Sequence, residues 1–230
     1  DSDEWLAHLP SGFEPGRIYQ LVYRSAGSTI VGLGMAAVRD IASYLKYAGP
    51  DGDPVAGAIH HAYAFGRSQC GRFLRQYVHL GLNEDEAGRM ALDGIIAHVA
   101  GAMRGEFNLR FGQPSKDICF ICPELFPFTD TPQRDPLTGE TGSVLAHLEE
   151  RGAVPKIMFI NTSSEYWRGD AALIHTDLES MTDAPEHESV RRYHFAGTQH
   201  GSGEFPAAVR RLGDGIRGRL PFGSVDYNPL

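Results

Sequence analysis

The sequence predicts an α/β fold in which a mostly parallel β-sheet carries helices on both faces. Strand-like apolar segments alternate with segments of helical periodicity along the chain, which is typical of such a sheet. A segment rich in proline, glycine and aromatic residues, at about 104–152, separates the third and fourth expected strands. A loop of this length is typical of a lid over a site. We therefore expect one domain over 1–230 with a lid-like insertion.

Each expected element has its own sequence signal. Five segments rich in β-branched, aromatic or small apolar residues predict strands: 17–25, 58–65, 92–103, 154–167 and 190–203. Residues 35–48 predict an amphipathic helix, because Val38, Ile41, Ala42 and Leu45 recur at helical spacing. A second helix is expected after Ser68, with an apolar face formed by Phe73, Leu74, Tyr77 and Val78. A short helix is expected at 143–151.

Composition and charge exclude several classes of partner. With 42% apolar residues among 230, the chain can bury a core. Its net charge of −8 argues against nucleic acid or an anionic membrane as the main partner. No apolar run approaches the roughly 20 residues that a membrane-spanning helix needs. We expect a small-molecule substrate, and the oligomeric state and the compartment are left open.

Two groups of possible metal ligands are judged incidental. Cys119 and Cys122 have C-x-x-C spacing, but they start no evident helix and have no two further zinc ligands nearby. Asp130 and Asp135 lie in a polar segment whose composition favours a turn-rich loop over a Ca²⁺ site. We therefore expect no metal and no cofactor.

The stretch HHAYAFGRSQCGRFLRQYVHL, at 60–80, places a serine at a strand-to-helix junction. Ser68 is flanked two residues away on each side by the small residues Gly66 and Cys70, which is the pattern of a nucleophile elbow. Elbows usually have two glycines here, and cysteine is small enough to replace one of them. A serine hydroxyl is a weak nucleophile, so the rest of the chain must supply a base and an orienting acid.

The elbow also predicts where an oxyanion would be held. The helix after Ser68 begins near Gln69, and the backbone N–H of Gln69 is the first expected oxyanion donor. A second donor is sought in YRSAG, at 23–27, with Arg24 and Ser25 as candidates, or in a part of the chain that precedes this sequence.

The base and the acid are expected at the ends of later strands, since the loops of a parallel sheet open at that edge. Among ten histidines, His200 directly follows the last expected strand, within GTQHGSG, where small residues allow its ring to reach across, and it is the favoured base. Glu165 follows the preceding strand, about 97 residues after Ser68 and 35 before His200. Asp170 and Asp177 are rival acids that fall inside or beyond the next predicted helix.

Five blocks in this order resemble the signature of a bacterial α/β-hydrolase-domain family whose substrates are mostly unknown: VGLGMAAVRDIASYL, AFGRSQCGRFLRQY, FNLRFGQPS, NTSSEYW and AGTQHG. The likeness runs from about residue 13 to the end. It implies the α/β-hydrolase fold, with Ser68 as nucleophile, Glu165 as acid and His200 as base. Family members usually have serine where this chain has Cys70. The resemblance also implies a fragment that lacks N-terminal strands and a C-terminal helix, and the count of about five strands agrees.

These observations predict a serine hydrolase that cleaves a carboxylic ester through an acyl-enzyme, with a Ser-His-Glu triad. Its substrate pocket is expected to be largely apolar and lined by aromatic residues: Phe107, Phe126, Tyr166 and Trp167. The aromatic residues of the insertion are equally consistent with a small core of its own. Two alternatives remain: an acyltransferase with the same triad, and a non-catalytic binding protein of α/β-hydrolase fold.

Overall fold

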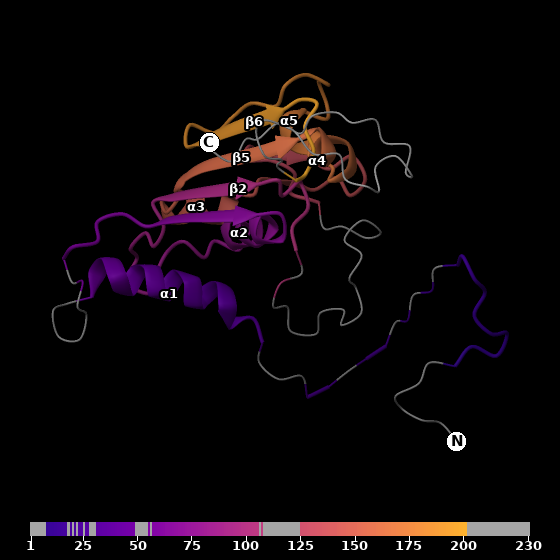
Figure 1. The fold of residues 1–230 in the computed structure, drawn as a ribbon, viewed down its shortest axis with the longest axis horizontal. Coiled ribbons are helices and arrows are strands. Elements are labelled where there is room, and N and C mark those ends of the chain that lie inside the picture. The colour runs from indigo at the N-terminus through magenta and orange to yellow at the C-terminus, as the bar shows by residue number, and fades with distance from the viewer. Residues whose placement is uncertain are drawn as a thin grey trace, which may run out of the picture.

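The computed structural model describes residues 8–17, 19, 21, 23–24, 26–27, 31–48, 55, 57–105, 107 and 125–201. Its central sheet has the strand order β1-β2-β5-β6 (Figure 1), formed by β1 (Tyr63–Arg67), β2 (Gly94–His98), β5 (Lys156–Thr162) and β6 (Val190–Phe195). All neighbouring strands in it are parallel. The expected parallel sheet is therefore confirmed, and its four strands overlap four of the five segments predicted as strands.

The register of the sheet determines which side chains share a face. Ile95 lies beside Ile157, and Ala97 beside Phe159, so alternate residues of neighbouring strands point the same way. Because the strands are parallel, the carboxyl ends of β1, β5 and β6 lie at one edge, where the loops that follow them can meet. A separate antiparallel pair is formed by β3 (Gln133–Arg134) and β4 (Thr141–Gly142).

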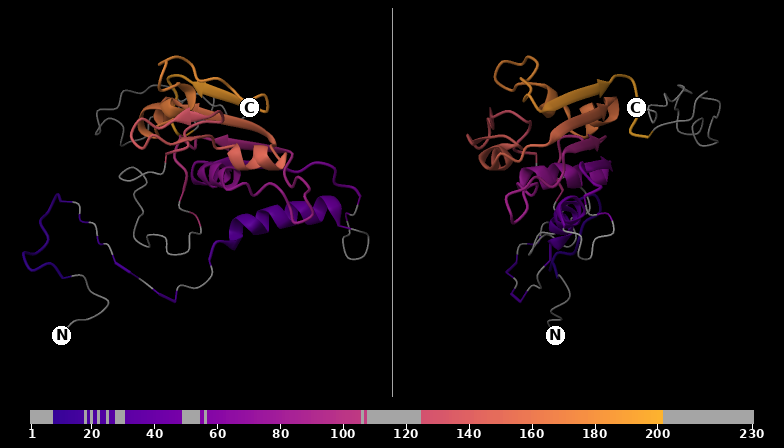
Figure 2. Two further views of the ribbon diagram at one scale, coloured as in Figure 1. Left: turned by 180° about the vertical axis from the view of Figure 1, so that it is seen from behind. Right: turned by 90° about the vertical axis from the view of Figure 1, so that its left-hand side faces the viewer.

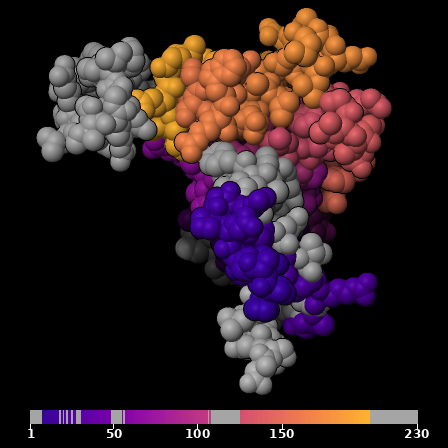
Figure 3. Space-filling view, turned by 90° about the vertical axis from the view of Figure 1, so that its right-hand side faces the viewer, coloured from indigo at the N-terminus to yellow at the C-terminus, as the bar shows by residue number. Residues whose placement is uncertain are grey.

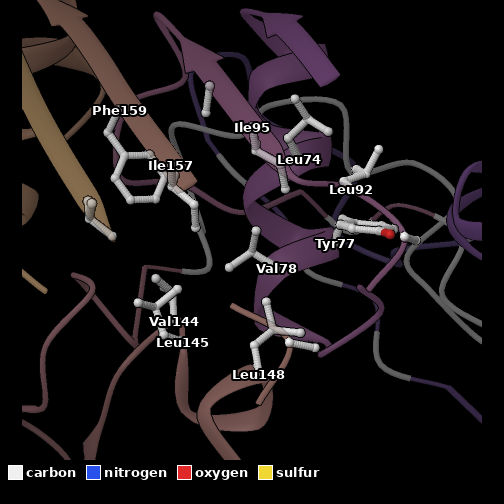
Figure 4. Packing of buried hydrophobic residues seen from close by; sticks show 14 of the residues in the cluster. Leu74, Tyr77, Val78, Leu92, Ile95, Val144, Leu145, Leu148, Ile157 and Phe159 are labelled. Carbon is white, nitrogen blue, oxygen red and sulfur yellow. The ribbon is translucent and has the colours of Figure 1, made fainter. Parts of the chain in front are cut away.

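The core lies between one face of the sheet and helix α2 (Gln69–His79), which packs on β1 and β2. Its buried side chains come from α2, from the strands and from the segment around α3 (Ala146–Arg151), as Figure 4 shows: Leu74, Tyr77, Val78, Ile95, Val144, Leu145, Leu148, Ile157 and Phe159. Burial of these apolar surfaces is the main contribution to the stability of the domain.

The other helices near the sheet contact the same face. His194 of β6 stacks on Tyr166 of α4 (Ser163–Arg168), and Arg192 of β6 donates to the carbonyl of Ile174 in α5 (Ala172–His175). The opposite face carries exposed apolar side chains, among them Tyr63 (74% exposed) and Phe65 (66%). Helices on both faces were expected, and in the described part of the chain they cover one (Figure 2).

Helix α1 (Leu33–Tyr47) confirms the first predicted helix, but its apolar face differs from the prediction. Met35, Ala42 and Ser43 are buried, whereas Ile41 and Leu45 are exposed. Polar contacts explain the rotation, because the Ser43 hydroxyl donates to Asp85 and the Lys46 ammonium lies 2.7 Å from Asp93 Oδ2. Within the described residues, no helix is long and apolar enough to cross a membrane.

The strand predicted at 17–25 is wrong for the residues that the structure describes in this range, which form no regular element. A strand is stable only when its backbone groups pair with a neighbour. Here the contacts are local, since the Glu14 N–H donates to the Tyr19 hydroxyl at 2.8 Å and the ring of Phe13 packs edge-on against Tyr19. Figure 3 shows the described N-terminal residues, in indigo, below the orange body formed by the C-terminal half.

The second part of the expected insertion belongs to the body of the domain. Val144, Leu145 and Leu148 are fully buried in the main core beside α2, although the sequence placed them within 104–152. Residues 108–124, with Cys119 and Cys122, lie outside the described residues, and a lid role for that segment stays a prediction.

This packing predicts that Leu148→Ala destabilises the whole domain. Leu148 is 0% exposed, and a buried Leu→Ala change costs about 2–5 kcal/mol in the free energy of unfolding. Leu137→Ala is the matched control, since Leu137 is 93% exposed and should change that free energy by less than about 0.5 kcal/mol. Urea denaturation measures both variants, and equal effects would contradict the assignment of α3 to the core.

Candidate active site

Ser68 occupies the turn between β1 and α2, with a backbone conformation that is unusual for serine. Its φ is 57° and its ψ is −116°, in a region that side chains other than glycine rarely adopt. The turn is held by the Ser68 N–H, which donates to the His98 carbonyl at the end of β2 at 2.8 Å. Strain of this kind at a strand-to-helix turn is what a nucleophile elbow stores.

Close packing around this turn depends on Gly66 and Gly71. A Cβ atom on Gly66 would lie 2.3 Å from the carbonyl oxygen of Cys70, and one on Gly71 would lie 3.0 Å from the Cβ of Ala100. Cys70 itself is exposed and its thiol is free. The turn therefore requires a second small residue at Gly71, whereas the cysteine at position 70 has an exposed side chain.

His200 lies in the loop after β6, with its ring against the serine. The distance from His200 Nε2 to Ser68 Oγ is 2.9 Å, and that from His200 Nδ1 to Glu165 Oε1 is 2.6 Å. An ionised carboxylate only accepts hydrogen bonds, so Nδ1 carries the proton in this arrangement and Nε2 accepts from the serine hydroxyl. The side chain of His200 is about half exposed, so this edge of the sheet is open to solvent.

Glu165 is held by the helix in which it lies. It is the third residue of α4 and completes a capping box with Thr162, the N-cap residue. Glu165 Oε2 accepts from the Thr162 N–H at 2.8 Å and from the Thr162 hydroxyl, which leaves Oε1 for His200. The residue is 4% exposed. The helix cap therefore fixes the rotamer of the carboxylate that meets the imidazole.

A second histidine, His98, lies close to the serine but serves another purpose. Its ring is buried and stacks on Phe65, with 5.8 Å between ring centroids. Burial, with a further effect of the Arg67 guanidinium, lowers the pKa of His98 and keeps its ring neutral. His98 supports the turn through its backbone carbonyl.

The other acidic candidates serve local structure. Asp177 accepts from the Ser180 N–H at 2.7 Å, and Asp135 accepts from the Leu137 N–H at 3.0 Å, so each stabilises a turn. Asp130 accepts from the His187 N–H at 2.7 Å. Across the described ranges, no group of three or more His, Cys, Asp or Glu side chains is placed to hold a metal ion.

The expected oxyanion donors have different positions. Gln69 is the first residue of α2, so its backbone N–H is one of those in the first helical turn that no carbonyl within the helix can reach. Arg24 is exposed in the N-terminal stretch and does not line the cavity beside Ser68. Ser25 lies outside the described residues.

A cavity of about 240 Å³ opens beside the serine. Its walls come from the elbow, from the end of β2 and from α4, and comprise Ser68, Arg72, Val99, Ala100, Met103, Ser164, Glu165, Arg168, Gly169 and His200. Part of this wall is apolar and part is cationic, which differs from the aromatic pocket that the sequence led us to expect.

The four aromatic residues expected in the pocket lie elsewhere. Phe107 packs edge-on against Phe73, and Phe126 against Phe128. Tyr166 stacks on the ring of His194, with centroids 4.8 Å apart, and the adjacent Trp167 is 80% exposed. None of the four rings lines the cavity described here.

Sequence reasoning missed Arg72 and Arg168, which line the cavity. The signal was available, because Arg72 follows Ser68 by four residues and Arg168 follows Glu165 by three. On a helix, residues at these spacings lie on one face. Once Ser68 and Glu165 were placed at helix starts, both arginines could have been assigned to the same site.

The comparisons with known proteins give the family of the chain. Residues 7–221 match the family described as "Alpha/beta hydrolase domain". No curated protein and no solved structure matches the chain significantly.

The packing at the elbow predicts that Gly66→Ala is strongly destabilising. The new methyl group would meet the backbone at Cys70, which cannot move without opening the turn, so the free energy of unfolding should fall by about 1–3 kcal/mol. Gly94→Ala is the control, because its methyl group would closely approach only the exposed Tyr63 side chain, at 2.8 Å, and would lie at an ordinary contact distance of 3.6 Å from the backbone oxygen of Lys156. Denaturation curves that show the same loss for both would refute the proposed constraint.

Proposed function

Because the chain belongs to the alpha/beta hydrolase domain family, we propose that it is a serine hydrolase that cleaves a carboxylic ester through an acyl-enzyme. Ser68 is the nucleophile, His200 the general base and Glu165 the acid that orients the histidine. One observation supports this most directly: the continuous hydrogen-bonded series from Ser68 Oγ through the His200 ring to Glu165 Oε1, at 2.9 and 2.6 Å.

In the acylation step, Ser68 Oγ attacks the ester carbonyl carbon while His200 Nε2 takes the hydroxyl proton. The imidazolium that forms is stabilised by Glu165, which also keeps the Nδ1 proton in place. The tetrahedral intermediate then collapses, the ester C–O bond breaks, and His200 gives its proton to the departing alcohol. The acyl group remains on Ser68.

In the deacylation step, a water molecule takes the place of the alcohol. His200 removes a proton from it, the hydroxyl oxygen adds to the acyl carbon, and the Ser68 oxygen leaves with the proton from His200. Carboxylic acid and free enzyme result. The open edge beside the half-exposed His200 gives water access to this position.

The negative charge of each tetrahedral intermediate needs donors that are already in place. The Gln69 N–H is one of these, and it lies at the positive end of the 11-residue helix α2. The second donor is proposed to come from the N-terminal part of the protein; Ser25 is the candidate that remains, since Arg24 does not line the cavity.

The mechanism predicts that Ser68→Ala abolishes turnover. Loss of the nucleophile should lower kcat for a small aliphatic ester by at least about 1,000-fold, and a fluorophosphonate probe should label the wild type at Ser68 alone. Ser189→Ala, one residue before β6, is the control and should be labelled and active like the wild type. Labelling at another residue, or ester hydrolysis by a protein that the probe does not label, would contradict the proposal. It would also be contradicted if the wild type neither hydrolysed the ester nor reacted with the probe.

Glu165→Gln tests whether catalysis needs a carboxylate that accepts from both Thr162 and His200. An amide cannot accept from both Thr162 and His200 as the carboxylate does, so one partner loses its bond and kcat should fall by about 10²–10⁴-fold. Glu149→Gln, in the first turn of the similarly short α3, is the matched control and should keep full activity. Melting temperatures of both variants separate loss of catalysis from loss of folding; an unchanged kcat for Glu165→Gln would exclude the assigned role.

A further inference from the structure

Two arginines from different helices meet at the cavity beside Ser68. Arg72 belongs to the second turn of α2 and Arg168 is the last residue of α4. Each lies about one helical turn from a residue of the proposed triad, and the Arg72 N–H donates to the Ser68 carbonyl at 3.0 Å. The helices therefore hold both guanidinium-bearing residues at a set position relative to the reacting groups.

The charge of the cavity wall is positive. Among the described lining residues, Arg72 and Arg168 contribute +2 and Glu165 contributes −1, which sums to +1 with a neutral His200 ring. Glu165 is the only carboxylate among the described lining residues, and both of its oxygens already have partners in Thr162 and His200. Within the described part of the chain, no carboxylate pairs with the Arg72 guanidinium. A positive cavity on a chain with net charge −8 favours an anionic ligand.

The rest of the wall limits the size and character of that ligand. Val99, Ala100 and Met103 form an apolar surface beside the arginines. A volume of about 240 Å³ is below the usual range for drug-sized ligands and suits a short hydrocarbon chain. The net charge of +1 on the described lining residues matches a monoanion better than a dianion such as phosphate.

We propose that the substrate is a small ester that carries a carboxylate, which Arg72 and Arg168 bind while a short hydrocarbon segment lies on the apolar wall. Guanidinium groups bind carboxylates through paired, charge-assisted hydrogen bonds, so the pair selects for this group and orients the ester toward Ser68. This inference rests on the proposed hydrolase function and names the substrate class for that same site.

Matched esters that differ only in charge test it. Monomethyl glutarate and its terminal amide, methyl 5-amino-5-oxopentanoate, have the same length, and hydrolysis is followed by methanol release. A second pair, acetoxyacetate and acetoxyacetamide, carries the charge on the alcohol side instead. In at least one pair, kcat/KM should be about tenfold or more higher for the anion. Because Arg168 is exposed, the preference should decrease as salt is added.

Arginine variants assign the preference to the two residues. Arg72→Gln and Arg168→Gln should each lower the anion-to-amide ratio of kcat/KM by about tenfold, mainly through KM for the anion. Arg72→Lys keeps the charge without the planar fork and should recover part of the ratio. Arg191→Gln, at the amino end of β6, is the control and should leave the ratio unchanged. Melting temperatures verify that each variant is folded.

The outcomes separate this inference from the proposed function. If the neutral esters are hydrolysed in a Ser68-dependent manner and no anion is preferred, the substrate class is wrong and the hydrolase assignment stands. If neither member of a pair is hydrolysed, calorimetry with monomethyl glutarate decides the charge argument by itself. Binding that Arg72→Gln abolishes supports an anion site, whereas absence of binding to the wild type overturns it.

Discussion

The candidate site depends on how one carboxylate divides its two oxygens. Oε2 of Glu165 closes the capping box of α4 through Thr162, and Oε1 meets His200 Nδ1 at 2.6 Å. The cap is a local interaction of about 1 kcal/mol, within the range of helix N-caps. Its consequence extends further, because a carboxylate fixed by its own helix presents a constant acceptor to a histidine on a separate loop. The tautomer of that histidine, and with it the acceptor offered to Ser68, follows from this contact.

The parallel sheet brings these three residues together from distant parts of the chain. Ser68 directly follows β1, Glu165 follows β5 within one helical turn, and His200 lies in the loop after β6. In the strand order β1-β2-β5-β6, every neighbouring pair is parallel, so the carboxyl ends of β1, β5 and β6 lie at one edge of the sheet (Figure 1). The buried face of the sheet, with α2 and α3 upon it, supplies the rigid support that a strained turn at Ser68 requires.

The cavity has a cationic part and an apolar part because both helix starts and strand ends meet at this edge of the sheet. Helices that start at the edge of the sheet carry Arg72 and Arg168 one turn away from Ser68 and Glu165, while the end of β2 and the residues after it contribute Val99 and Ala100. A site built from helix starts and strand ends in this way combines backbone N–H groups, charged side chains and an apolar wall within a small volume.

Much of this protein followed from its sequence alone, because the deciding signals are local. The alternation of strand and helix, the small residues Gly66 and Cys70 around Ser68, and the order of Ser68, Glu165 and His200 are readable without coordinates. Only the tertiary structure decided that the four expected aromatic rings do not line the cavity, which face of α1 is buried, and that the described residues of 17–25 form no strand. Such outcomes depend on neighbours that are distant in the chain. Leu148 is buried because α3 packs against α2, whereas Trp167 remains 80% exposed. Periodicity identifies an apolar side chain, whereas its contacts are determined by the fold.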